Sequence, residues 1–501
     1  MDLLSFLKSK FGFSAFRPGQ EEVIRSLLDG KDTLAMLATG TGKSLCYQLP
    51  AYLLDGSCII VSPLLSLMQD QTEQMKMRGE KSVVALNSFL TGPEREAALA
   101  HLGAFKFIFV SPEMLHNRYV LGKLKTIRTA LFAVDEAHCI SQWGHDFRPE
   151  YLNLGEVRKQ LGTPLTLALT ATATEQVRDD ICKYLGLKDP NRFIYSVNRP
   201  NIAIKIDRIP SYREKEEKLV AYAKNLQKPG IIYFSSKKAA EEMAARLRQE
   251  GIAEAAAYHS GIDQEQRILI QQQFIYGQIK IICATSAFGM GVNKADIRFV
   301  IHFHLPLQME AYLQEIGRAG RDGLPSIAVL LYTEGDERLP LQLIEAELPT
   351  DAQLAAFSRW KGDLKEAGAA LGCTEPQLRF LLHHRVLNLP EEAWTREVAA
   401  IRDERMAYKR RKLKEMVQMV RSSSCRRSEI LRYFGEPPAA GNEACCDICG
   451  LETALYESNQ KSGGTLETVP AWELLLQDLF RKGEQKWHEE NRRIGSRNSQ
   501  T

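Results

Sequence analysis

Residues 33–44 read TLAMLATGTGKS, an apolar run that leads directly into a glycine-rich turn. The run predicts a buried strand, and residues 45–54, which follow the turn, have the length and apolar character of a helix. In such a turn, backbone N–H groups can curl around phosphate oxygens at the N-terminus of the helix. Lys43 is then expected to reach the β- and γ-phosphates of a nucleotide, and Ser44 to ligate Mg²⁺. The candidate nucleotide-binding residues of this loop are Thr39, Gly40, Thr41, Gly42, Lys43 and Ser44.

The loop departs from the full phosphate-loop pattern, GxxxxGKS or GxxxxGKT, at one position. That pattern requires a glycine at position 37, where this chain has Leu37. A glycine-rich turn between a strand and a helix in an unrelated α/β protein is therefore the alternative that this motif alone leaves open.

A pair of carboxylates follows a second apolar run further along the chain. Residues 131–134 read LFAV and lead directly into Asp135, Glu136 and His138. Open parallel sheets bind ligands at the carboxyl ends of their strands, where this pair is expected to lie. Asp135 would hold Mg²⁺ through its water shell, and Glu136 would orient or deprotonate an attacking water. Together with the phosphate loop, the pair predicts an ATPase.

Short apolar runs alternate with helix-length amphipathic segments in two successive parts of the chain. Continuous apolar runs suit strands that are buried on both faces, so each part is expected to form a parallel sheet covered by helices, an α/β fold. A cleft between two such lobes is the natural place for a ligand. The expected strands of the first lobe are residues 33–37, 58–61, 107–110, 131–134 and 165–169, and those of the second lobe are residues 230–234, 255–258, 280–283, 299–303 and 327–332.

The remainder of the chain has no strand rhythm, and the charge-rich stretch 208–218 is typical of a linker between lobes. The expected domains are lobe 1 at residues 1–207, lobe 2 at 208–335, a helical linker and zinc-binding module at 336–450, and a short, partly disordered tail at 451–501.

Residues 402–427 combine many Lys and Arg side chains with apolar positions at near-helical spacing, which predicts an amphipathic basic helix. This helix is a candidate for holding the phosphates of DNA. The alternative is a structural helix whose basic face is solvated or paired with nearby acids. The cations in question are Lys409, Arg410, Arg411, Lys412 and Lys414.

Composition limits the class of protein. The 501 residues carry a formal net charge of +3, which neither requires nor excludes a nucleic-acid partner, and 44% of them are hydrophobic, enough to bury several cores. The sequence contains no run of about 20 apolar residues, so no membrane span is predicted. The N-terminus lacks the features of a signal peptide. Four of the ten cysteines cluster within residues 425–449, which indicates a metal site rather than a disulfide framework. We therefore expect a cytoplasmic protein.

Two arginines lie in residues 314–323, which read QEIGRAGRDG, within the second lobe. Arg321, with Arg318 behind it, could reach across the cleft to the γ-phosphate and stabilise charge in the transition state. Hydrolysis would then depend on closure of the cleft. The alternative for this segment is a surface helix with structural salt bridges.

These motifs, in this order, resemble those of the superfamily 2 helicases. The similar segments are residues 16–20 (FRPGQ), the phosphate loop, and residues 135–138 (DEAH), 169–173 (LTATA) and 314–323. Within that superfamily, His138 and the segments 141–151 (SQWGHDFRPEY) and 284–294 (ATSAFGMGVNK) resemble the RecQ DNA helicases. The resemblance extends over residues 11–450 and implies two tandem RecA-like lobes followed by a small α-helical zinc-binding module.

Carried over by position, the resemblance implies further site residues. Gln20 would read the edge of the adenine, with Phe13 stacked on its ring and Arg17 nearby. An aromatic-rich loop and a threonine motif would couple single-stranded DNA to ATP hydrolysis, since aromatic rings beside a guanidinium group can stack on unpaired bases. The alternative for the aromatic residues of the loop is a place in the hydrophobic core. The implied coupling residues are Trp143, His145, Phe147, Arg148, Thr170 and Thr172.

The cysteine cluster resembles the zinc module of the same family, because Cys425-Arg426-Arg427 is followed by residues 432–436 (RYFGE) and 446–449 (CDIC). Four thiolates in a short segment predict a tetrahedral structural zinc site. Its expected ligands are Cys425, Cys445, Cys446 and Cys449. The departure is that Cys445 and Cys446 are adjacent, so both can bind one metal only if the backbone bends sharply. Glu443 is the alternative to Cys445, and four free thiols are the alternative to a metal site.

The sequence therefore predicts an ATP-dependent DNA helicase of the RecQ type, with ATP, Mg²⁺ and Zn²⁺ as cofactors. By resemblance, the protein would move 3′ to 5′ on single-stranded DNA and act in DNA repair or recombination. Its expected partners are single-stranded and tailed or branched DNA, together with single-strand-binding or repair proteins, and no membrane. Residues 451–501 are too few for the winged-helix and C-terminal helical domains of longer family members, so we expect a short form.

Three alternative functions stay open at this point. A single-strand translocase that unwinds poorly is favoured by the short C-terminus. An RNA helicase is disfavoured by His138 and by the loop that contains Trp143. A non-catalytic DNA-binding scaffold is disfavoured by the presence of Lys43, Asp135, Glu136 and Arg321 together.

Overall fold

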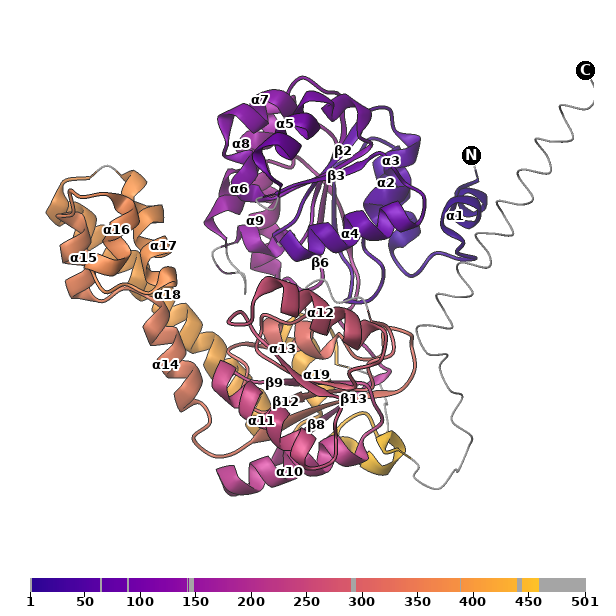
Figure 1. The fold of residues 1–501 in the computed structure, drawn as a ribbon, viewed down its shortest axis with the longest axis vertical. Helices are drawn as coiled ribbons and strands as arrows, with labels where there is room; N and C mark the ends of the chain where they lie inside the picture. Colours follow the sequence, from indigo (N-terminus) through magenta and orange to yellow (C-terminus); the bar gives the residue numbers. More distant parts are fainter. Residues whose placement is uncertain are drawn as a thin grey trace, which may run out of the picture. The chain divides into compact units, whose positions relative to one another are not determined.

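The computed structural model of the chain describes residues 2–63, 65–87, 90–141, 143, 148–289, 294–387, 389–438 and 444–458. Its elements follow the predicted order, with two α/β parts and then a helical part (Figure 1). His145, Phe147 and Glu443 lie outside the described residues, as does most of the predicted tail. Among the helices of the described residues, none is both long enough and apolar enough to cross a membrane.

The first lobe is built on a seven-stranded parallel sheet with the strand order β3-β4-β2-β5-β6-β1-β7. The five predicted strands all form, each within two residues of its predicted bounds. The two edge strands are not among those predicted from the sequence. Strand β7 is polar and mostly exposed, so it has no apolar pattern, whereas β3 is a short apolar run, VVAL, from which a strand could have been predicted. The strands are β1 (Thr33–Met36), β2 (Ser57–Val61), β3 (Val83–Leu86), β4 (Phe107–Val110), β5 (Thr129–Val134), β6 (Thr166–Thr170) and β7 (Asn191–Ile194).

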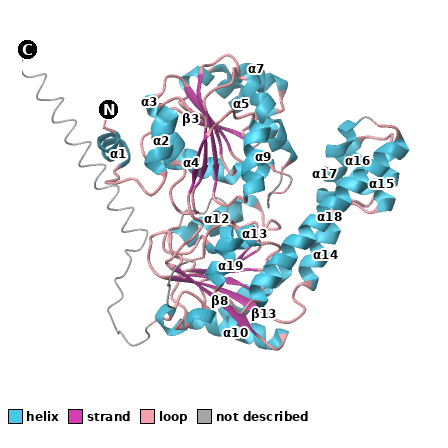
Figure 2. Ribbon diagram, turned by 180° about the vertical axis from the view of Figure 1, so that it is seen from behind, coloured by secondary structure: helices cyan, strands magenta, loops and turns pink. Residues whose placement is uncertain are grey.

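Helices cover both faces of this sheet, as the continuous apolar strands require. Along β1, Leu34 and Met36 pack into one hydrophobic cluster, and Ala35 and Leu37 pack into another on the opposite face. Both clusters are completed by helices, so the strand is buried on both sides (Figure 2). The helices are α1 (Leu3–Phe11), α2 (Gln20–Leu28), α3 (Leu45–Leu53), α4 (Leu65–Met77), α5 (Gly92–Ala100), α6 (Pro112–Leu115), α7 (Arg118–Leu124), α8 (Leu154–Gln160) and α9 (Glu175–Leu185).

The second lobe has a six-stranded parallel sheet with the order β10-β11-β9-β12-β13-β8. Its five predicted strands also form. The elements are β8 (Ile202–Arg208), α10 (Tyr212–Asn225), β9 (Gly230–Tyr233), α11 (Lys237–Gln249), β10 (Ala255–Tyr258), α12 (Gln264–Ile275), β11 (Ile281–Ala284), β12 (Phe299–His302), α13 (Met309–Ile316) and β13 (Ser326–Tyr332).

The structure corrects the start of the second lobe. Strand β8 pairs with β13 along its whole length, so the predicted boundary between residues 207 and 208 falls inside a strand of the second sheet. The stretch 208–218 is not a linker either, because α10 begins at Tyr212 with Ser211 as its N-cap. Its many charges lie on the outer surface of a helix, whereas Lys215 and Leu219 are buried against the sheet.

The described residues after position 335 contain no strand of either sheet, as predicted. The 31-residue helix α18 is the longest element, and α15, α16 and α17 gather around its N-terminal end (Figures 1 and 2). These four helices share a hydrophobic cluster of their own, which includes Phe357, Leu381 and Trp394. The helices are α14 (Arg338–Glu347), α15 (Asp351–Ser358), α16 (Leu364–Ala370), α17 (Glu375–His384), α18 (Glu391–Arg421) and α19 (Arg426–Tyr433).

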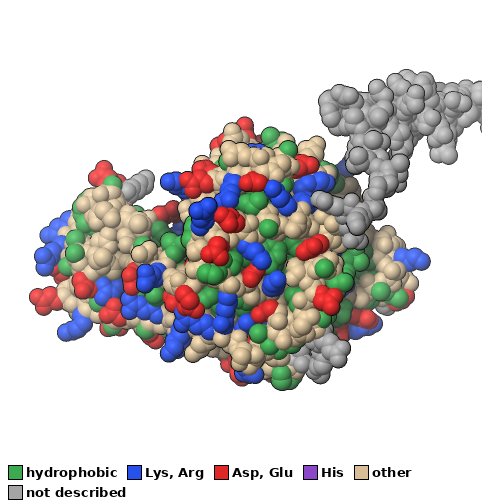
Figure 3. Space-filling view, turned by 90° about the horizontal axis from the view of Figure 1, so that it is seen from below, with side chains coloured by type: hydrophobic (Ala, Val, Ile, Leu, Met, Phe, Trp, Pro, Cys, Tyr) green, Lys and Arg blue, Asp and Glu red, His purple; other side chains and the backbone are tan. Residues whose placement is uncertain are grey.

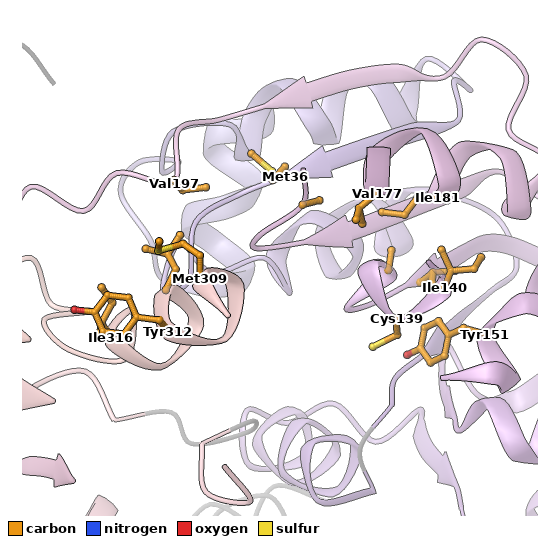
Figure 4. Close-up of a cluster of buried hydrophobic side chains, with 14 of the residues drawn as sticks. Met36, Cys139, Ile140, Tyr151, Val177, Ile181, Val197, Met309, Tyr312 and Ile316 are labelled. Carbon is orange, nitrogen blue, oxygen red and sulfur yellow. The ribbon is translucent and has the colours of Figure 1, made fainter. Parts of the chain in front are cut away.

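The largest cluster of buried side chains joins parts of the chain that are far apart in sequence. It includes Met36 of β1, Val197 of the connector between the sheets, and Met309, Tyr312 and Ile316 of α13 (Figure 4). The carboxyl end of β1 and the helix that precedes the two predicted arginines are therefore packed into one core.

Candidate functional site

The phosphate loop lies between β1 and α3, as predicted. Gly40 and Gly42 have φ values of +87° and +77°, a backbone conformation that favours glycine. The Thr41 hydroxyl donates to the carbonyl of Ala38 over 2.8 Å, which closes the turn. Helix α3 begins immediately afterwards, at Leu45, so its N-terminal N–H groups face the loop.

Gln20 and Arg17 contact this loop directly. The Gln20 side-chain amide donates to the carbonyls of Thr41 and Gly42, over 2.8 and 3.0 Å. Its Oε1 accepts from the Arg17 backbone N–H over 2.9 Å, and the Arg17 guanidinium group donates to the Gly40 carbonyl. Phe13, the expected adenine-stacking ring, is 46% exposed. Two of the three predicted adenine-site residues, Arg17 and Gln20, therefore lie at the phosphate loop, and the ring of Phe13 is open to solvent.

Asp135 and Glu136 follow the carboxyl end of β5. The Asp135 N–H donates to the carbonyl of Val61 at the end of neighbouring β2, over 2.9 Å. Burial, with the negative charge of Glu136, raises the pKa of Asp135, and the ammonium group of Lys43 opposes that shift. Lys43 is thus close enough to act on the Asp135 carboxyl group. Glu136 has a φ of +46°, a left-handed conformation that is costly for a non-glycine residue and that is typical of functional turns.

His138 connects Glu136 to the threonine motif at the end of β6. Its Nδ1 lies 3.4 Å from Glu136 Oε2 and 3.0 Å from Thr170 Oγ1, and the ring is 1% exposed. Thr170 in turn donates to the carbonyl of Thr172 over 3.2 Å. A continuous set of contacts therefore links the predicted catalytic carboxylate to both threonines of the predicted coupling motif.

Of the two predicted arginines, Arg321 lies beside the phosphate loop. A Cβ atom at Gly40 would come within 2.9 Å of Arg321 Cγ. Burial, with the charges of Arg318 and Arg199 nearby, lowers the pKa of Arg321 to about 9. Arg318 is also buried and donates to the carbonyl of Gly289. The surface-helix alternative for this segment is therefore wrong.

Arg199 is a site residue that the sequence analysis missed. Its guanidinium group donates to the Thr39 carbonyl of the phosphate loop over 2.7 Å and to the Gly317 carbonyl after α13 over 3.2 Å. It also donates to the carbonyls of Ala319 and Gly320, over 3.1 and 2.7 Å. Because all four acceptors are backbone groups, no side-chain pattern could have predicted these contacts. The only signal was the position of this arginine in the connector between the two expected lobes.

The predicted coupling loop is described at Trp143 and Arg148. Trp143 is half-buried, and its ring lies 4.8 Å from the Tyr408 ring of α18, between centroids. The Tyr408 hydroxyl donates to the Trp143 carbonyl. Arg148 donates to the Pro63 carbonyl over 2.7 Å. The core alternative thus accounts for part of the Trp143 ring, and α18 holds this end of the loop.

The four clustered cysteines meet in space. Their sulfur atoms all lie within 4.8 Å of one another. Three of the separations are 3.5 Å (Cys425–Cys445), 3.9 Å (Cys425–Cys446) and 3.5 Å (Cys446–Cys449). Tetrahedral zinc with Zn–S bonds of about 2.3 Å requires S···S distances of roughly 3.8 Å, so the donor set fits zinc. The expected bend is present, because Ala444 has a φ of +59° immediately before Cys445.

The zinc-binding segment is attached to the second sheet. The Ile204 N–H donates to the Cys445 carbonyl over 3.2 Å, and Ile204 and Cys446 form an isolated parallel bridge at the edge of β8. The Asp447 carboxylate accepts from the Ile206 N–H and pairs with the buried Arg426 over 2.9 Å. The module therefore extends the sheet at its free edge.

The basic helix predicted over residues 402–427 forms only in part, because α18 ends at Arg421 and residues 426–427 belong to α19. Most of its named cations have partners. Lys409 pairs with Glu347, and Arg410 pairs with Glu345 over 2.7 Å. Lys412 is buried and pairs with Glu310 of α13 over 2.8 Å. These contacts favour the structural alternative for this helix. On the face of the molecule in Figure 3, Lys/Arg and Asp/Glu side chains are interspersed.

Three protein families match successive parts of the chain. The DEAD/DEAH box helicase family matches residues 17–180, the helicase conserved C-terminal domain family matches residues 214–323, and the RecQ zinc-binding family matches residues 380–450. The first two regions contain the two parallel sheets apart from β7, β8 and β13, and the third contains the cysteine cluster.

The chain is similar over most of its length to curated bacterial proteins. It is 45% identical over 481 residues to the probable ATP-dependent DNA helicase RecS of Bacillus subtilis, a match that covers 94% of this chain and 96% of RecS. It is 44% identical over 352 residues to the ATP-dependent DNA helicase RecQ of Haemophilus influenzae, a match that covers 70% of this chain and 56% of that RecQ.

Solved structures support the fold. The helicase Lhr of Mycobacterium smegmatis, determined with single-stranded DNA and AMP-PNP, superimposes with a TM-score of 0.56 at 20% identity, over 84% of this chain and 57% of Lhr. At this identity, the likeness supports the architecture of tandem lobes and nothing finer.

Proposed function

The chain belongs to the RecQ family of ATP-dependent DNA helicases, and we propose that it couples ATP hydrolysis to 3′-to-5′ movement on single-stranded DNA and to duplex unwinding in DNA repair or recombination. The observation that carries the proposal is the meeting of the phosphate loop, the carboxylate pair and the arginines at one site. The curated relatives are named DNA helicases, so an RNA helicase is not proposed. The bacterial relatives are also consistent with the expected location in the cytoplasm.

The charges at the site suit a magnesium-bound triphosphate. Burial lowers the pKa of Arg321, and repulsion from Arg318 and Arg199 lowers it further, so a polyphosphate bound here would relieve that repulsion. Lys43 would bind the β- and γ-phosphates. Ser44 and Asp135 would hold Mg²⁺, which offsets phosphate charge when it is bound. These assignments rest on the motif positions and on the proximity of Lys43 to Asp135.

Glu136 is the proposed base that orients or deprotonates the attacking water. Its left-handed backbone and its contact with His138 fix its carboxylate at the end of β5. Arg321 would act on the γ-phosphate from the second lobe, with Arg318 behind it. Catalysis would then require the two lobes to be correctly placed, which makes hydrolysis sensitive to what the lobes bind.

The path from DNA to the base runs through His138 and the two threonines. The contacts Glu136–His138–Thr170 join the carboxylate to a motif that, by family resemblance, responds to movement of the DNA strand. Trp143 and Arg148, with His145 and Phe147, are proposed to contact unpaired bases. Single-stranded and tailed or branched DNA are the proposed substrates, and single-strand-binding or repair proteins are proposed partners on the resemblance alone.

The proposed function is tested by ATP turnover with single-stranded DNA, with single-stranded RNA and without nucleic acid. We expect stimulation by DNA, unwinding of a 3′-tailed duplex but not of a 5′-tailed one, and loss of hydrolysis in Lys43→Ala. Glu136→Gln should retain ATP binding but hydrolyse ATP more slowly by orders of magnitude. Glu156→Gln on the outer surface of α8 is the control. Wild-type turnover by Glu136→Gln would show that the base is assigned wrongly, and DNA-stimulated turnover without unwinding would favour a translocase.

A further inference from the structure

The helices α15, α16 and α17 lie largely outside the matched families. Residues 324–379 fall between the helicase C-terminal match and the zinc-binding match, which begins inside α17. The three helices nevertheless have a core of their own with the start of α18, in which Ala367 and Leu381 are fully buried. This unit is therefore a built element whose purpose the ATPase site does not explain.

The sequence of α16 and α17 has the spacing of a helix-turn-helix motif. Residues 364–383 read LKEAGAALGCTEPQLRFLLH, two short helices separated by the four residues 371–374. A turn of this length with a glycine is typical of the motif. Ala367 on the first helix and Leu378 and Leu381 on the second supply the apolar contacts between the helices.

The turn between α16 and α17 has a glycine where the backbone is left-handed and a threonine where the second helix begins. Gly372 has a φ of +57°, and the Cys373 N–H donates back to the Gly368 carbonyl over 2.9 Å. A Cβ at Gly368 would lie 2.9 Å from a methyl carbon of Leu378, so the two helices are in close contact there and a larger residue would displace the Leu378 side chain. Thr374 then caps α17 in a reciprocal capping box with Gln377. The turn and the cap thus hold the second helix against the first.

We propose that this unit is a duplex-DNA-binding helix-turn-helix, with the N-terminal half of α17 placed in the major groove. In such motifs the first residues of the second helix contact base edges while the first helix crosses the backbone. The corresponding residues Glu375, Pro376 and Arg379 are exposed, as are the flanking cations Lys361 and Arg385. The proposal goes beyond the ATPase function and does not depend on its residue assignments.

In the free protein, Arg379 forms an ion pair with an acidic side chain. It pairs with Glu375 one turn earlier over 2.7 Å, and their side chains are 57% and 83% exposed. A DNA phosphate or a guanine edge would compete with Glu375 for this guanidinium group. The two residues should therefore affect DNA binding in opposite directions, which a purely structural pair would not do.

Helix α17 lies near the residues that are proposed to contact unpaired bases. Arg379, Phe380 and His383 line a groove together with Trp143 and Pro149 of the proposed DNA-coupling loop. A duplex bound on α17 would lie next to the residues proposed to contact unpaired bases. The unit is thus suited to hold the double-stranded side of a junction between single and double strands.

The test measures binding of the full chain to a blunt, fluorescein-labelled DNA duplex, without nucleotide, at several salt concentrations. Arg379→Glu should weaken binding about tenfold and lower the slope of log affinity against log salt by about 1. Glu375→Gln should strengthen binding, because it frees Arg379. The control is Arg25→Glu on α2, since Arg25 also pairs with a glutamate one turn earlier, Glu21, and its side chain is 59% exposed.

Two results would overturn the proposal. One is duplex affinity of Arg379→Glu within twofold of the Arg25→Glu control, with the same salt slope. The other is an equal loss on an RNA duplex of the same length, because the deep, narrow major groove of A-form RNA does not admit a helix. Since nucleotide is absent, failure of the proposed ATPase assignments would leave this measurement readable.

Discussion

Arg427 of α19 donates a hydrogen bond of 2.9 Å to the backbone carbonyl of Arg199, the arginine that contacts the phosphate loop. Arg427 is 3% exposed, and it also donates to Asn198 Oδ1 and to the Ile202 carbonyl, both over 2.6 Å. It lies two residues after Cys425, one of the proposed zinc ligands. The zinc-binding module therefore fixes the connector that carries Arg199, and through it the backbone on both sides of the nucleotide site.

Arg199→Ala should lower DNA-stimulated ATP turnover about tenfold, with a smaller effect on the KM for ATP. The arginine touches no expected reacting atom, but its loss leaves the carbonyls of Thr39 and Gly317 without the donor that joins them. Arg321 would then be less well positioned, and positioning affects kcat more than binding. Steady-state kinetics measure both constants. Arg192→Ala, at an exposed ion pair on β7, is the control. An unchanged kcat would make Arg199 a packing residue only.

Cys445→Ala should lose the zinc that the purified protein is expected to hold at about one ion per chain. Its sulfur is one of four within 4.8 Å, and its carbonyl accepts from the Ile204 N–H. Metal analysis gives the zinc content, and hydrogen exchange at residues 202–206 should increase when the metal is lost. Cys373→Ala, a half-buried cysteine outside the cluster, is the control. Full retention of zinc by Cys445→Ala would point to water or Glu443 as the fourth ligand.

The sequence predicted the parts of this fold that have a repeating physical cause. Strands buried on both faces are apolar throughout, so ten strands of the two sheets could be located from runs such as 107–110 and 299–303. Strand β7 could not, because an exposed edge strand has no apolar signal. Strand β8 lies at an edge of the second sheet, and its isoleucines alternate with Lys205 and Asp207, which is a strand pattern that the sequence analysis did not use.

The site was predictable where chemistry dictates residue type, and not where the backbone is the partner. Phosphate, Mg²⁺ and zinc favour Lys, Asp and Cys side chains, so Lys43, Asp135 and the four cysteines could be proposed from their spacing. Arg199 and Arg427 bind mainly carbonyl groups, which every residue possesses, so only the folded chain shows them. The contact between Tyr408 and Trp143 joins positions far apart in the sequence and leaves no local pattern.

Asp70→Asn should stabilise the protein against unfolding more at pH 7.5 than at pH 4.5. Burial raises the pKa of Asp70 to about 6, although Gln271 of the second lobe donates to it over 2.9 Å. A raised pKa means that ionisation disfavours the folded state, a cost that is absent below the ordinary pKa of about 4 and complete above the folded pKa. We expect about 1 kcal/mol at pH 7.5, after a discount for solvent screening.

Thermal unfolding at the two pH values checks this expectation. Asparagine keeps an oxygen acceptor for Gln271, so the contact between the lobes need not be lost. Asp55→Asn is the control, since Asp55 is 81% exposed and paired with Arg128. An equal shift at both pH values would mean that the effect comes from packing and not from the charge of Asp70.

Trp143→Ala should leave basal ATP turnover largely intact and weaken its stimulation by single-stranded DNA. Loss of one base stack costs about 1–3 kcal/mol at that contact.

The structure supplies a rival explanation, because the Trp143 ring also packs on Tyr408, and its removal could loosen the loop instead. Trp143→Phe separates the two, since a smaller aromatic ring can still stack on a base but fills less of the space beside Tyr408. Tyr408→Phe removes only the hydroxyl that donates to the Trp143 carbonyl. If stacking is the cause, Trp143→Phe keeps most of the stimulation and Tyr408→Phe changes it little. If anchoring is the cause, Tyr408→Phe reproduces the loss, and the role of Trp143 lies in holding the loop on α18.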